Sequence, residues 1–518
     1  MPSIQTLSPE VLSEIFLHCV VTNEVTLPSC APILLTRVTR LWRAVALSTP
    51  RLWSHLCLAR SSVWTKPSKA HVHLPSDDVT KARSYVTALK TWLSLSKCTS
   101  LTLSFFVQEI APTAGDEDML AEYMRILCIH SARWKDVKIH ILFNLLKIIM
   151  ILNQCRSLPL LESFYFDNED AISEPIDITI LESASLLRRA RITYPFLQSW
   201  FLPWSQLTCL SIKHCIGSSS DAMDEMKFFD VDLFIEILSH CINLEVLNVH
   251  CDFVVFPSVA RSTSTFAILP QLQSFRMVIS VDDEDEEDAN EAEITLALLV
   301  QCLTHLVLPK LRTLVLTIRS IHHRWDDSFL QFLTHFSESL EHLEIIYCSL
   351  PLHMAKSMLE RLSNLTSMMV ILFDITSARD WEGILGGLTL TSTAYGSKQL
   401  VPALTQLQVS WLDHFFAYRK EGLETMSLFY ESLATMIESR WQARSCRVLE
   451  VGEGTDAPSG LITLCLGHSE IAVEKMALLQ CARIARCMEE GLHLVNSLRK
   501  PPSFRSCADD KTSMYPRW

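Results

Sequence analysis

The sequence predicts an α/β fold in which a short helical module precedes a long array of alternating strands and helices. Three observations lead to this prediction. A leucine-based phrase recurs along the chain, segments with helical spacing of apolar residues separate its copies, and three helix signals crowd into residues 1–58. At 518 residues, 49% of them hydrophobic, the chain is too long for one ordinary core and apolar enough to be packed along most of its length.

The N-terminal module opens with a strong helix signal. Ser8 suits the N-cap position and Pro9 the first helical position. Apolar residues then follow at helical spacing, at Val11, Leu12, Ile15, Phe16 and Cys19. A second helix is expected over 33–47, and a third, short one begins after Thr49-Pro50. Three such short helices bury little apolar surface by themselves, so we expect them to pack on a following domain or on a partner.

Three anchor groups occur in order within this module. They are Leu7-x-Pro9-Glu10-x-Leu12-x-x-Ile15-Phe16, then Val38-x-x-x-Trp42-Arg43-x-x-Ala46, then Ser48-Thr49-Pro50-x-Leu52-Trp53. Together they resemble the F-box-like motif of mushroom-type fungal proteins. The sequence departs from the family pattern at Ser8, where a proline is usual, and at Thr39, where a cysteine is common.

The resemblance implies a docking function. In that family the motif binds a small Skp-type adaptor, which links to a cullin scaffold and recruits ubiquitylation machinery. Carried over to this chain, the resemblance implies that the adaptor-facing or supporting surface is formed by Leu7, Pro9, Leu12, Ile15, Phe16, Val38 and Trp42.

The recurring phrase is L-x-x-L-x-L or a conservative variant of it. Its alternating apolar residues predict a short strand with one face in the core. Copies begin at Leu161, Leu187, Leu207, Leu244, Leu272, Leu311, Leu340, Leu365 and Leu404, and weaker ones lie near residues 101, 137 and 448. The copy at 340 continues to Cys348-x-Leu350 and so matches the whole leucine-rich-repeat consensus. The sequence therefore predicts a leucine-rich-repeat solenoid, in which each unit is completed by the next.

The spacing of the copies is irregular, from twenty residues (Leu187 to Leu207) to thirty-nine (Leu272 to Leu311). Helical returns or insertions must fill the longer intervals. Helices are expected over 80–95, 228–241, 292–303, 328–336, 352–362, 424–441 and 471–495. This alternation of strands and helices favours an α/β solenoid over a doubly wound sheet.

The predicted organisation has five parts. They are an adaptor-docking module (1–58), a helical bridge (59–97), an irregular repeat array (98–455), a helical C-terminal cap (456–499) and a tail expected to be disordered (500–518). The array contains an acidic insertion at 282–293, which begins with seven consecutive acidic residues. Such a run is either a solvated insertion or a docking site for a basic partner.

Residues between the core leucines of each phrase should point away from the core and form a concave recognition face. On this face the target-binding candidates are Tyr165, Arg189, Arg191, Lys213, His250, Arg276, His342 and Glu344. Arg189, Arg191 and Lys213 make a basic cluster. Two interpretations stay open: the cluster binds an acidic peptide, or its members are ordinary solvated strand residues.

Composition and motifs argue against several functions. Glycine is scarce, with 12 residues, and the sequence contains neither G-x-G-x-x-G nor G-x-x-x-x-G-K-[ST]. It also lacks G-x-S-x-G, H-E-x-x-H and a catalytic Cys-His signature, so we expect no enzyme and no cofactor. The seventeen cysteines include no C-x-x-C pair, so we expect no metal site. A net charge of −13 without a basic stripe disfavours nucleic acid as a partner.

The expected location is the cytoplasm, the nucleus or both. Many scattered thiols favour a reducing compartment, and the first Lys or Arg is Arg37, which disfavours a secretory signal. The most apolar stretch, 139–152, is shorter than the roughly 20 residues that span a bilayer, so we expect no membrane association.

The sequence therefore favours a non-catalytic substrate-recognition subunit of a Skp-cullin-F-box type ubiquitin ligase. Its partners would be the Skp-type adaptor, a cullin scaffold through that adaptor, and an unknown protein substrate on the repeat face. The alternative is a leucine-rich-repeat interaction scaffold that no longer engages a ubiquitin ligase. Adaptor binding separates these two hypotheses. An enzyme is the third hypothesis, and a reproducible activity abolished by one substitution would revive it.

Overall fold

The structure of the protein is a computed structural model. It describes residues 7–20, 31–60, 79–107, 114–141, 146–155, 157–168, 177–194, 199–214, 231–252, 266–280, 303–319, 327–346, 352–372, 385–386, 388–389, 403–411, 431–440, 463–467, 482–489 and 493–496. These residues fall into two compact units. The N-terminal unit ends, among described residues, at His214, and the C-terminal unit begins at Val231. Both units are mixed α/β structures built on parallel strands.

The N-terminal unit opens with four short helices: α1 (Pro9–His18), η2 (Leu34–Arg37), α2 (Arg40–Ser48) and η3 (Pro50–Trp53). Ser8 caps α1, because its side chain accepts a hydrogen bond from the backbone of Val11. The single helix predicted over 33–47 is wrong in one respect, since η2 and α2 are separate. Thr39 adopts an extended conformation between them, and its side chain accepts from the Trp42 backbone at 3.1 Å to start α2 afresh.

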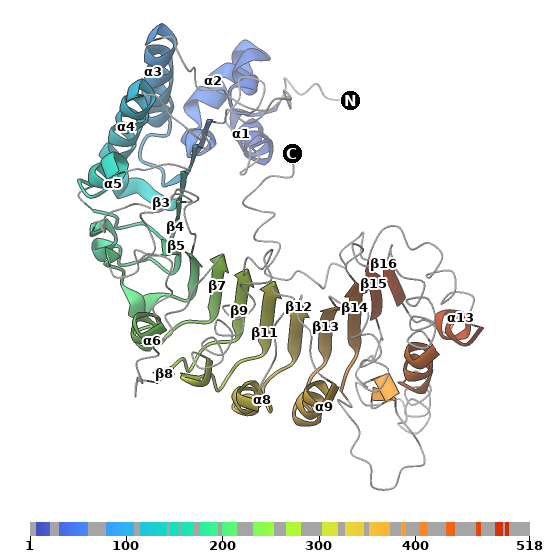
Figure 1. Cartoon of the computed structure of the whole chain (residues 1–518). Coiled ribbons are helices and arrows are strands. Elements are labelled where there is room, and N and C mark those ends of the chain that lie inside the picture. Colours follow the sequence, from blue (N-terminus) through green and yellow to red (C-terminus); the bar gives the residue numbers. More distant parts are fainter. Residues whose placement is uncertain are drawn as a thin grey trace. The chain divides into compact units, whose positions relative to one another are not determined.

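Six described strands of this unit pair in parallel and in chain order. They are β1 (His55–Arg60), β2 (Leu101–Val107), β3 (Trp134–Ile141), β4 (Ser163–Asn168), β5 (Arg189–Tyr194) and β6 (Cys209–His214). Three helices return the chain: α3 (Val79–Leu95), α4 (Ala114–Ile129) and α5 (Leu146–Leu152). They lie along the same side of the row of strands (Figure 1). The helix predicted over 80–95 is confirmed by α3.

The C-terminal unit repeats this arrangement with eight described strands in one parallel row. They are β7 (Val246–Asp252), β9 (Ser274–Ser280), β11 (Thr313–Arg319), β12 (His342–Ile346), β13 (Ser367–Leu372), β14 (Gln406–Trp411), β15 (Thr463–Gly467) and β16 (His493–Asn496). Helices α6 (Val231–Ser239), α8 (Asp327–Thr334) and α9 (Leu352–Arg361) fall within the predicted helical segments or match them to within one residue. A separate small sheet pairs β8 (Ala267–Ile268) with β10 (Leu306–Val307).

All nine strong copies of the leucine phrase form strands, which confirms that part of the prediction. Each strand begins two residues after the first leucine of its phrase, and all nine of these leucines are buried. The residue that follows the first leucine of each phrase stands just before the strand. Its backbone N–H donates a hydrogen bond to the carbonyl of the equivalent residue in the preceding phrase: Arg188 N–H donates to Glu162 O at 3.0 Å, and Thr208 N–H donates to Arg188 O at 2.8 Å. The same bond links residues 245, 273, 312, 341, 366 and 405 in turn, at 2.8–2.9 Å.

The weaker copies have mixed outcomes. Those near 101 and 137 form β2 and β3, whereas the one near 448 lies outside the described residues. The helix expected over 292–303, the acidic insertion and the tail from residue 500 also lie outside them, apart from Leu303. Of the helix expected over 424–441, residues 431–440 are described and helical.

The helical C-terminal cap predicted over 456–499 is helical only in part among its described residues. The described part contains two parallel strands, β15 and β16, and one short helix, α13 (Ala482–Glu489). Residues 493–495, the end of the helix expected over 471–495, belong to β16. They instead extend the sheet, where Leu494 lies beside Leu464 and each strand gains backbone hydrogen bonds from its neighbour.

No helix in the described part of the chain combines the length and the apolar character needed to cross a lipid bilayer.

Candidate functional site

The helical module has a small apolar core of its own. Leu12 and Phe16 lie on one side of α1 and are fully buried. The Phe16 ring lies 4.9 Å from the Trp42 ring of α2, measured between centroids. Trp53 of η3 donates its indole N–H to the carbonyl of Ala46 at 2.8 Å. The core therefore ties α1, α2 and η3 together.

The module is also anchored to the strand-bearing part of the N-terminal unit. The Trp53 ring contacts that of Trp92 on α3 edge to face, with 4.8 Å between centroids. The hydroxyl groups of Ser13 and Thr49 lie 3.0 Å apart and join α1 to the start of η3. These contacts fix the helices, so the side chains that remain outside are presented on a rigid base.

Several apolar side chains of the module are exposed. Ile15 on α1 is 37% exposed, and Val38, which ends η2, is 51% exposed. Four further members of this exposed apolar set are Val11, Leu34, Leu41 and Leu47. These six side chains lie on or beside α1, η2 and α2, so the apolar residues of the module are not all used in its own core.

The predicted adaptor-binding residues therefore divide into two groups. Leu12 and Phe16 are core residues that support the module, and Leu7 and Trp42 are half-buried. Pro9, Ile15 and Val38 are exposed. Sequence analysis did not name Val11, Leu34, Leu41 or Leu47 as docking residues. For Val11 the sequence offered a signal, because it adjoins Leu12 in the apolar stripe of α1, of which Leu12 and Phe16 are the buried members.

A second candidate site lies on the strands of the N-terminal unit. Apolar residues of β3–β6 alternate with polar ones, and the apolar set is buried in the core. We call the opposite side the charged strand face. It is made by Asp136, Lys138 and His140 of β3, Ser163, Tyr165 and Asp167 of β4, Arg189, Arg191 and Thr193 of β5, and Cys209, Ser211 and Lys213 of β6.

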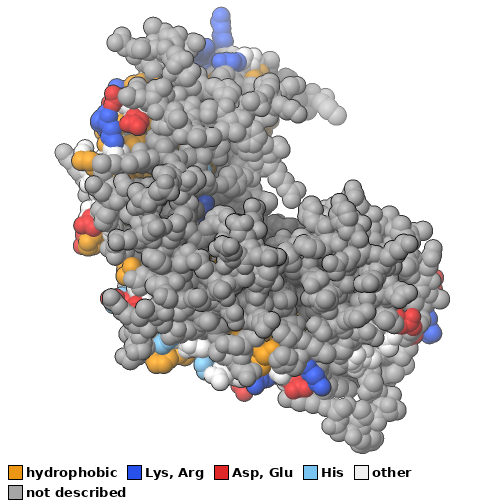
Figure 2. All heavy atoms as spheres, viewed as in Figure 1, with side chains coloured by type: hydrophobic (Ala, Val, Ile, Leu, Met, Phe, Trp, Pro, Cys, Tyr) orange, Lys and Arg blue, Asp and Glu red, His pale blue; other side chains and the backbone are white. Residues whose placement is uncertain are grey.

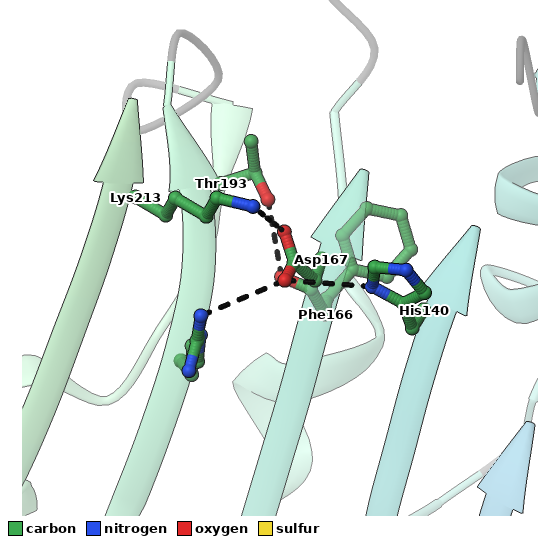
Figure 3. Close-up of polar contacts among 6 residues, drawn as sticks. His140, Phe166, Asp167, Thr193 and Lys213 are labelled. Carbon is green, nitrogen blue, oxygen red and sulfur yellow. Dashed lines mark hydrogen bonds and ion pairs between the residues drawn. The ribbon is translucent and has the colours of Figure 1, made fainter. Parts of the chain in front are cut away.

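Asp167 is the centre of an ion-pair network on this face (Figure 3). Its carboxylate oxygens lie 3.3 Å from Lys213 Nζ, 3.6 Å from an Arg191 terminal nitrogen and 3.5 Å from His140 Nδ1. Lys213 and His140 approach it from opposite sides, and Thr193 donates its hydroxyl to the Phe166 carbonyl at 3.3 Å. Asp167, His140 and Lys213 are all buried.

Two of the ion pairs cross over an intervening strand. Arg189 on β5 reaches Asp136 on β3 at 3.2 Å, although Ser163 of β4 lies between them in register. Lys213 on β6 likewise reaches Asp167 on β4, although Thr193 of β5 lies beside Lys213. In both cases the residue beneath the pair is a small hydroxyl residue and is buried. Small side chains at these positions leave room for the long cationic side chain to cross.

The network keeps Asp167 ionised. Burial alone would raise the pKa of Asp167, because a carboxylate is poorly solvated in the interior. The interaction with His140 and the positive charges of Lys213 and Arg191 outweigh burial and hold this pKa well below its ordinary value.

The structure brings some of the predicted target-binding residues together and not others. Tyr165, Arg189, Arg191 and Lys213 share the charged strand face. Lys213 was expected to point into solvent, but it is buried because its ammonium group reaches back to Asp167. Lys138 lies over the Tyr165 ring at 5.4 Å from the centroid and was missed, because the β3 copy of the phrase is weak.

The other predicted target-binding residues belong to the C-terminal unit. His250, Arg276 and His342 are half-buried strand residues there. Glu344 was expected on the open face but is buried, with Oε1 2.9 Å from His342 Nε2. A buried carboxylate requires such a partner, so Glu344 acts within the fold rather than as a direct contact for a target.

Figure 2 shows hydrophobic, basic and acidic side chains interspersed among the described residues visible on that face of the molecule. Among the described residues, no group of three or more His, Cys, Asp or Glu side chains is placed to hold a metal ion. Comparison of the sequence with protein-family models and with curated proteins finds no match in either case.

Proposed function

We propose that this chain is a non-catalytic substrate-recognition subunit of a Skp-cullin-F-box type ubiquitin ligase. The N-terminal helices would bind the Skp-type adaptor, and the strand face of the repeats would bind the protein to be modified. The observation that carries the proposal is the division within the motif: Leu12 and Phe16 hold the module together, while Ile15 and Val38 stay exposed. Docking requires such exposed apolar groups on a folded base.

The repeats support the second half of the proposal. Strands that begin at the same phrase position, with the same backbone bond recurring along β4–β6 and along β7–β14, are the behaviour expected of an irregular leucine-rich-repeat solenoid. A row of parallel strands presents successive side chains on one broad surface. We propose that this surface recognises the target.

The two departures from the family motif are compatible with docking. Ser8 caps α1, and Thr39 caps α2 with a hydrogen bond to Trp42. Each substitution therefore adds a helix-capping group at a helix start rather than removing an apolar group from the exposed set.

The test is co-purification of the full-length chain with a Skp-type adaptor from the same organism. The informative variant is Ile15→Asp with Val38→Asp, because both side chains are exposed and a charge there should leave the core intact. Ile242→Asp is the control, since Ile242 is an aliphatic residue of the C-terminal unit that is as exposed as Val38. Leu12 and Phe16 are unsuitable, because a buried charge would unfold the module.

We expect the wild type and the Ile242→Asp variant to retain the adaptor and the double variant to lose it, with unchanged circular dichroism. A wild-type chain that is folded and does not bind the adaptor would overturn the receptor proposal. The interaction-scaffold alternative would then be preferred.

A further inference from the structure

We propose that the charged strand face is a recognition site for an acidic peptide segment, with Lys138, Tyr165 and Arg189 as its contact residues. This inference rests on the proposed function, in that it names the class of target that the repeat face would take. Lys138 is a contact residue in this proposal, although the sequence did not predict it. Lys213 supports the site through its ion pair with Asp167 instead of contacting the ligand.

The charged strand face carries more positive than negative charge. Among the described residues of this face, Lys138, Arg189, Arg191 and Lys213 carry permanent positive charges, and Asp136 and Asp167 are the carboxylates. The face therefore has a surplus of two positive charges in a chain whose net charge is −13. A local potential opposite in sign to that of the whole chain favours an anionic ligand at this place.

The carboxylates of Asp136 and Asp167 hold cationic side chains in place, and not all of these cations are buried. The Arg189 side chain is 51% exposed while it holds Asp136 at 3.2 Å. Lys138 and Tyr165 are half-buried. Arg191 and Lys213 are more deeply placed against Asp167. The ion pair with Asp136 restricts the Arg189 side chain, and the contact with the Tyr165 ring restricts Lys138, which lowers the entropic cost of binding.

The proposed contact residues lie on three neighbouring strands, β3, β4 and β5. Lys138 and Tyr165 are partners in register on β3 and β4, and the exposed Arg189 lies on the next strand, β5, one position along the same face from Arg191, the register partner of Tyr165. Neighbouring parallel strands lie about 4.8 Å apart. A peptide running across the strands would therefore meet a cation, an aromatic ring and a second cation in sequence. Aspartate or glutamate side chains on such a peptide can accept charge-assisted hydrogen bonds from both cations.

A peptide is favoured over a nucleic acid because the face carries two carboxylates among its cations. A phosphate backbone has closely spaced charges and is repelled by fixed carboxylates, whereas a peptide can place its acidic side chains to avoid them. Nucleic acid binding is therefore an outcome of the test and not part of the proposal.

The experiment measures binding of a fluorescein-labelled synthetic peptide, in which Asp and Glu alternate with Gly and Ser, to the full-length chain by fluorescence anisotropy. The variant is Lys138→Glu with Arg189→Glu. The charge-matched control is Lys310→Glu with Lys356→Glu, because both of these lysines are exposed residues of the C-terminal unit. The two double variants have the same net charge.

We expect the dissociation constant to rise about tenfold or more in the Lys138→Glu, Arg189→Glu variant and to stay within about twofold of wild type in the control. We also expect binding to weaken as NaCl is raised from about 50 to 300 mM. The proposal is overturned if the wild type does not bind the peptide, if both double variants lose it equally, or if a single-stranded oligonucleotide of equal charge binds more tightly.

A third variant separates loss of contact from loss of structure. Lys138→Gln removes the charge without adding a carboxylate next to Asp136, and it should weaken peptide binding with an unchanged unfolding midpoint. Unaltered peptide binding by this variant would remove Lys138 from the site. Adaptor co-purification is measured on the same samples. If the adaptor binds and the peptide does not, the ligand class is wrong while the receptor function stands.

Discussion

Asp167 is the residue on which the charged network of the N-terminal unit converges, since His140, Arg191 and Lys213 all approach its carboxylate. Removing one member of a buried set of charges leaves the others without compensation, which costs more than the pair contributes when intact. The effect of a substitution here is therefore expected to be large.

We predict that Asp167→Asn lowers the free energy of unfolding by roughly 3–5 kcal/mol, because Arg191 and Lys213 lose the carboxylate they share. Urea unfolding followed by tryptophan fluorescence measures the change. Glu182→Gln, at an exposed position of a neighbouring turn, should change stability by less than about 0.5 kcal/mol. Equal small effects for the two variants would show that the network contributes little.

The same residue predicts a dependence on acid. The pKa of Asp167 is lower in the folded chain than its ordinary value of 3.8. Its stabilising contribution is therefore fully present above that value and is lost as the pH falls below it toward the lowered folded pKa. The wild type should lose stability more steeply than Asp167→Asn as the pH is lowered below about 4, so that the two unfolding curves converge.

Thr39 gives a prediction about a helix cap. Thr39→Ala removes the acceptor for the Trp42 backbone N–H and should destabilise the start of α2 by about 1 kcal/mol. Hydrogen exchange followed by mass spectrometry should show faster exchange in 40–48, whereas Thr39→Ser should keep the wild-type rate. Unchanged exchange in Thr39→Ala would mean that packing of α2, and not its cap, limits opening there.

At the scale of elements, the leucine phrase determines which residues enter the core. Leu186 and Leu187 are neighbours in the chain, but Leu187 is fully buried as the first leucine of its phrase and Leu186 is exposed. Both residues are leucines, and they differ only in their position relative to the phrase. They therefore test the phrase directly.

We predict that Leu187→Ala lowers the free energy of unfolding by about 2–5 kcal/mol, because the fully buried side chain leaves a cavity in the core. Leu186→Ala should cost less than about 1 kcal/mol. The comparison requires urea unfolding of both variants under the same conditions. Similar losses would mean that the phrase does not govern packing at this repeat.

At the scale of the whole molecule, the proposed function divides between two surfaces made of different residues. The exposed apolar set belongs to the helical module, and the charged strand face belongs to β3–β6. No residue is shared by the two sets, so each can be altered while the other stays chemically intact.

We predict that the two binding activities separate completely. Ile15→Asp with Val38→Asp should abolish adaptor binding and leave the affinity for the acidic peptide within about twofold of wild type. Lys138→Glu with Arg189→Glu should do the reverse. Co-purification and fluorescence anisotropy on the same preparations measure both activities, and a variant that loses both would indicate that the surfaces are coupled.

The sequence by itself determined the positions of the strands that follow the leucine phrases and the buried leucines of those phrases. In each leucine phrase, alternating apolar residues can be buried together only as a strand, and all nine strong copies are strands. Ser8-Pro9 likewise indicated the start of α1 correctly. By contrast, residues 493–495 belong to β16, although the sequence favoured a helix over 471–495, because a short apolar pattern is compatible with both periods until a neighbouring strand offers hydrogen bonds.

Tertiary structure alone decided how the polar side chains are used. Periodicity placed Arg189, Arg191 and Lys213 on one face, but it could not show that Arg189 and Lys213 cross a strand to reach Asp136 and Asp167. It also could not separate Leu12 and Phe16, which are buried, from Ile15 and Val38, which are exposed. Burial of apolar residues follows local spacing along the chain. Ion pairs and exposed surfaces depend on which strands and helices become neighbours, and that is settled only when the chain has folded.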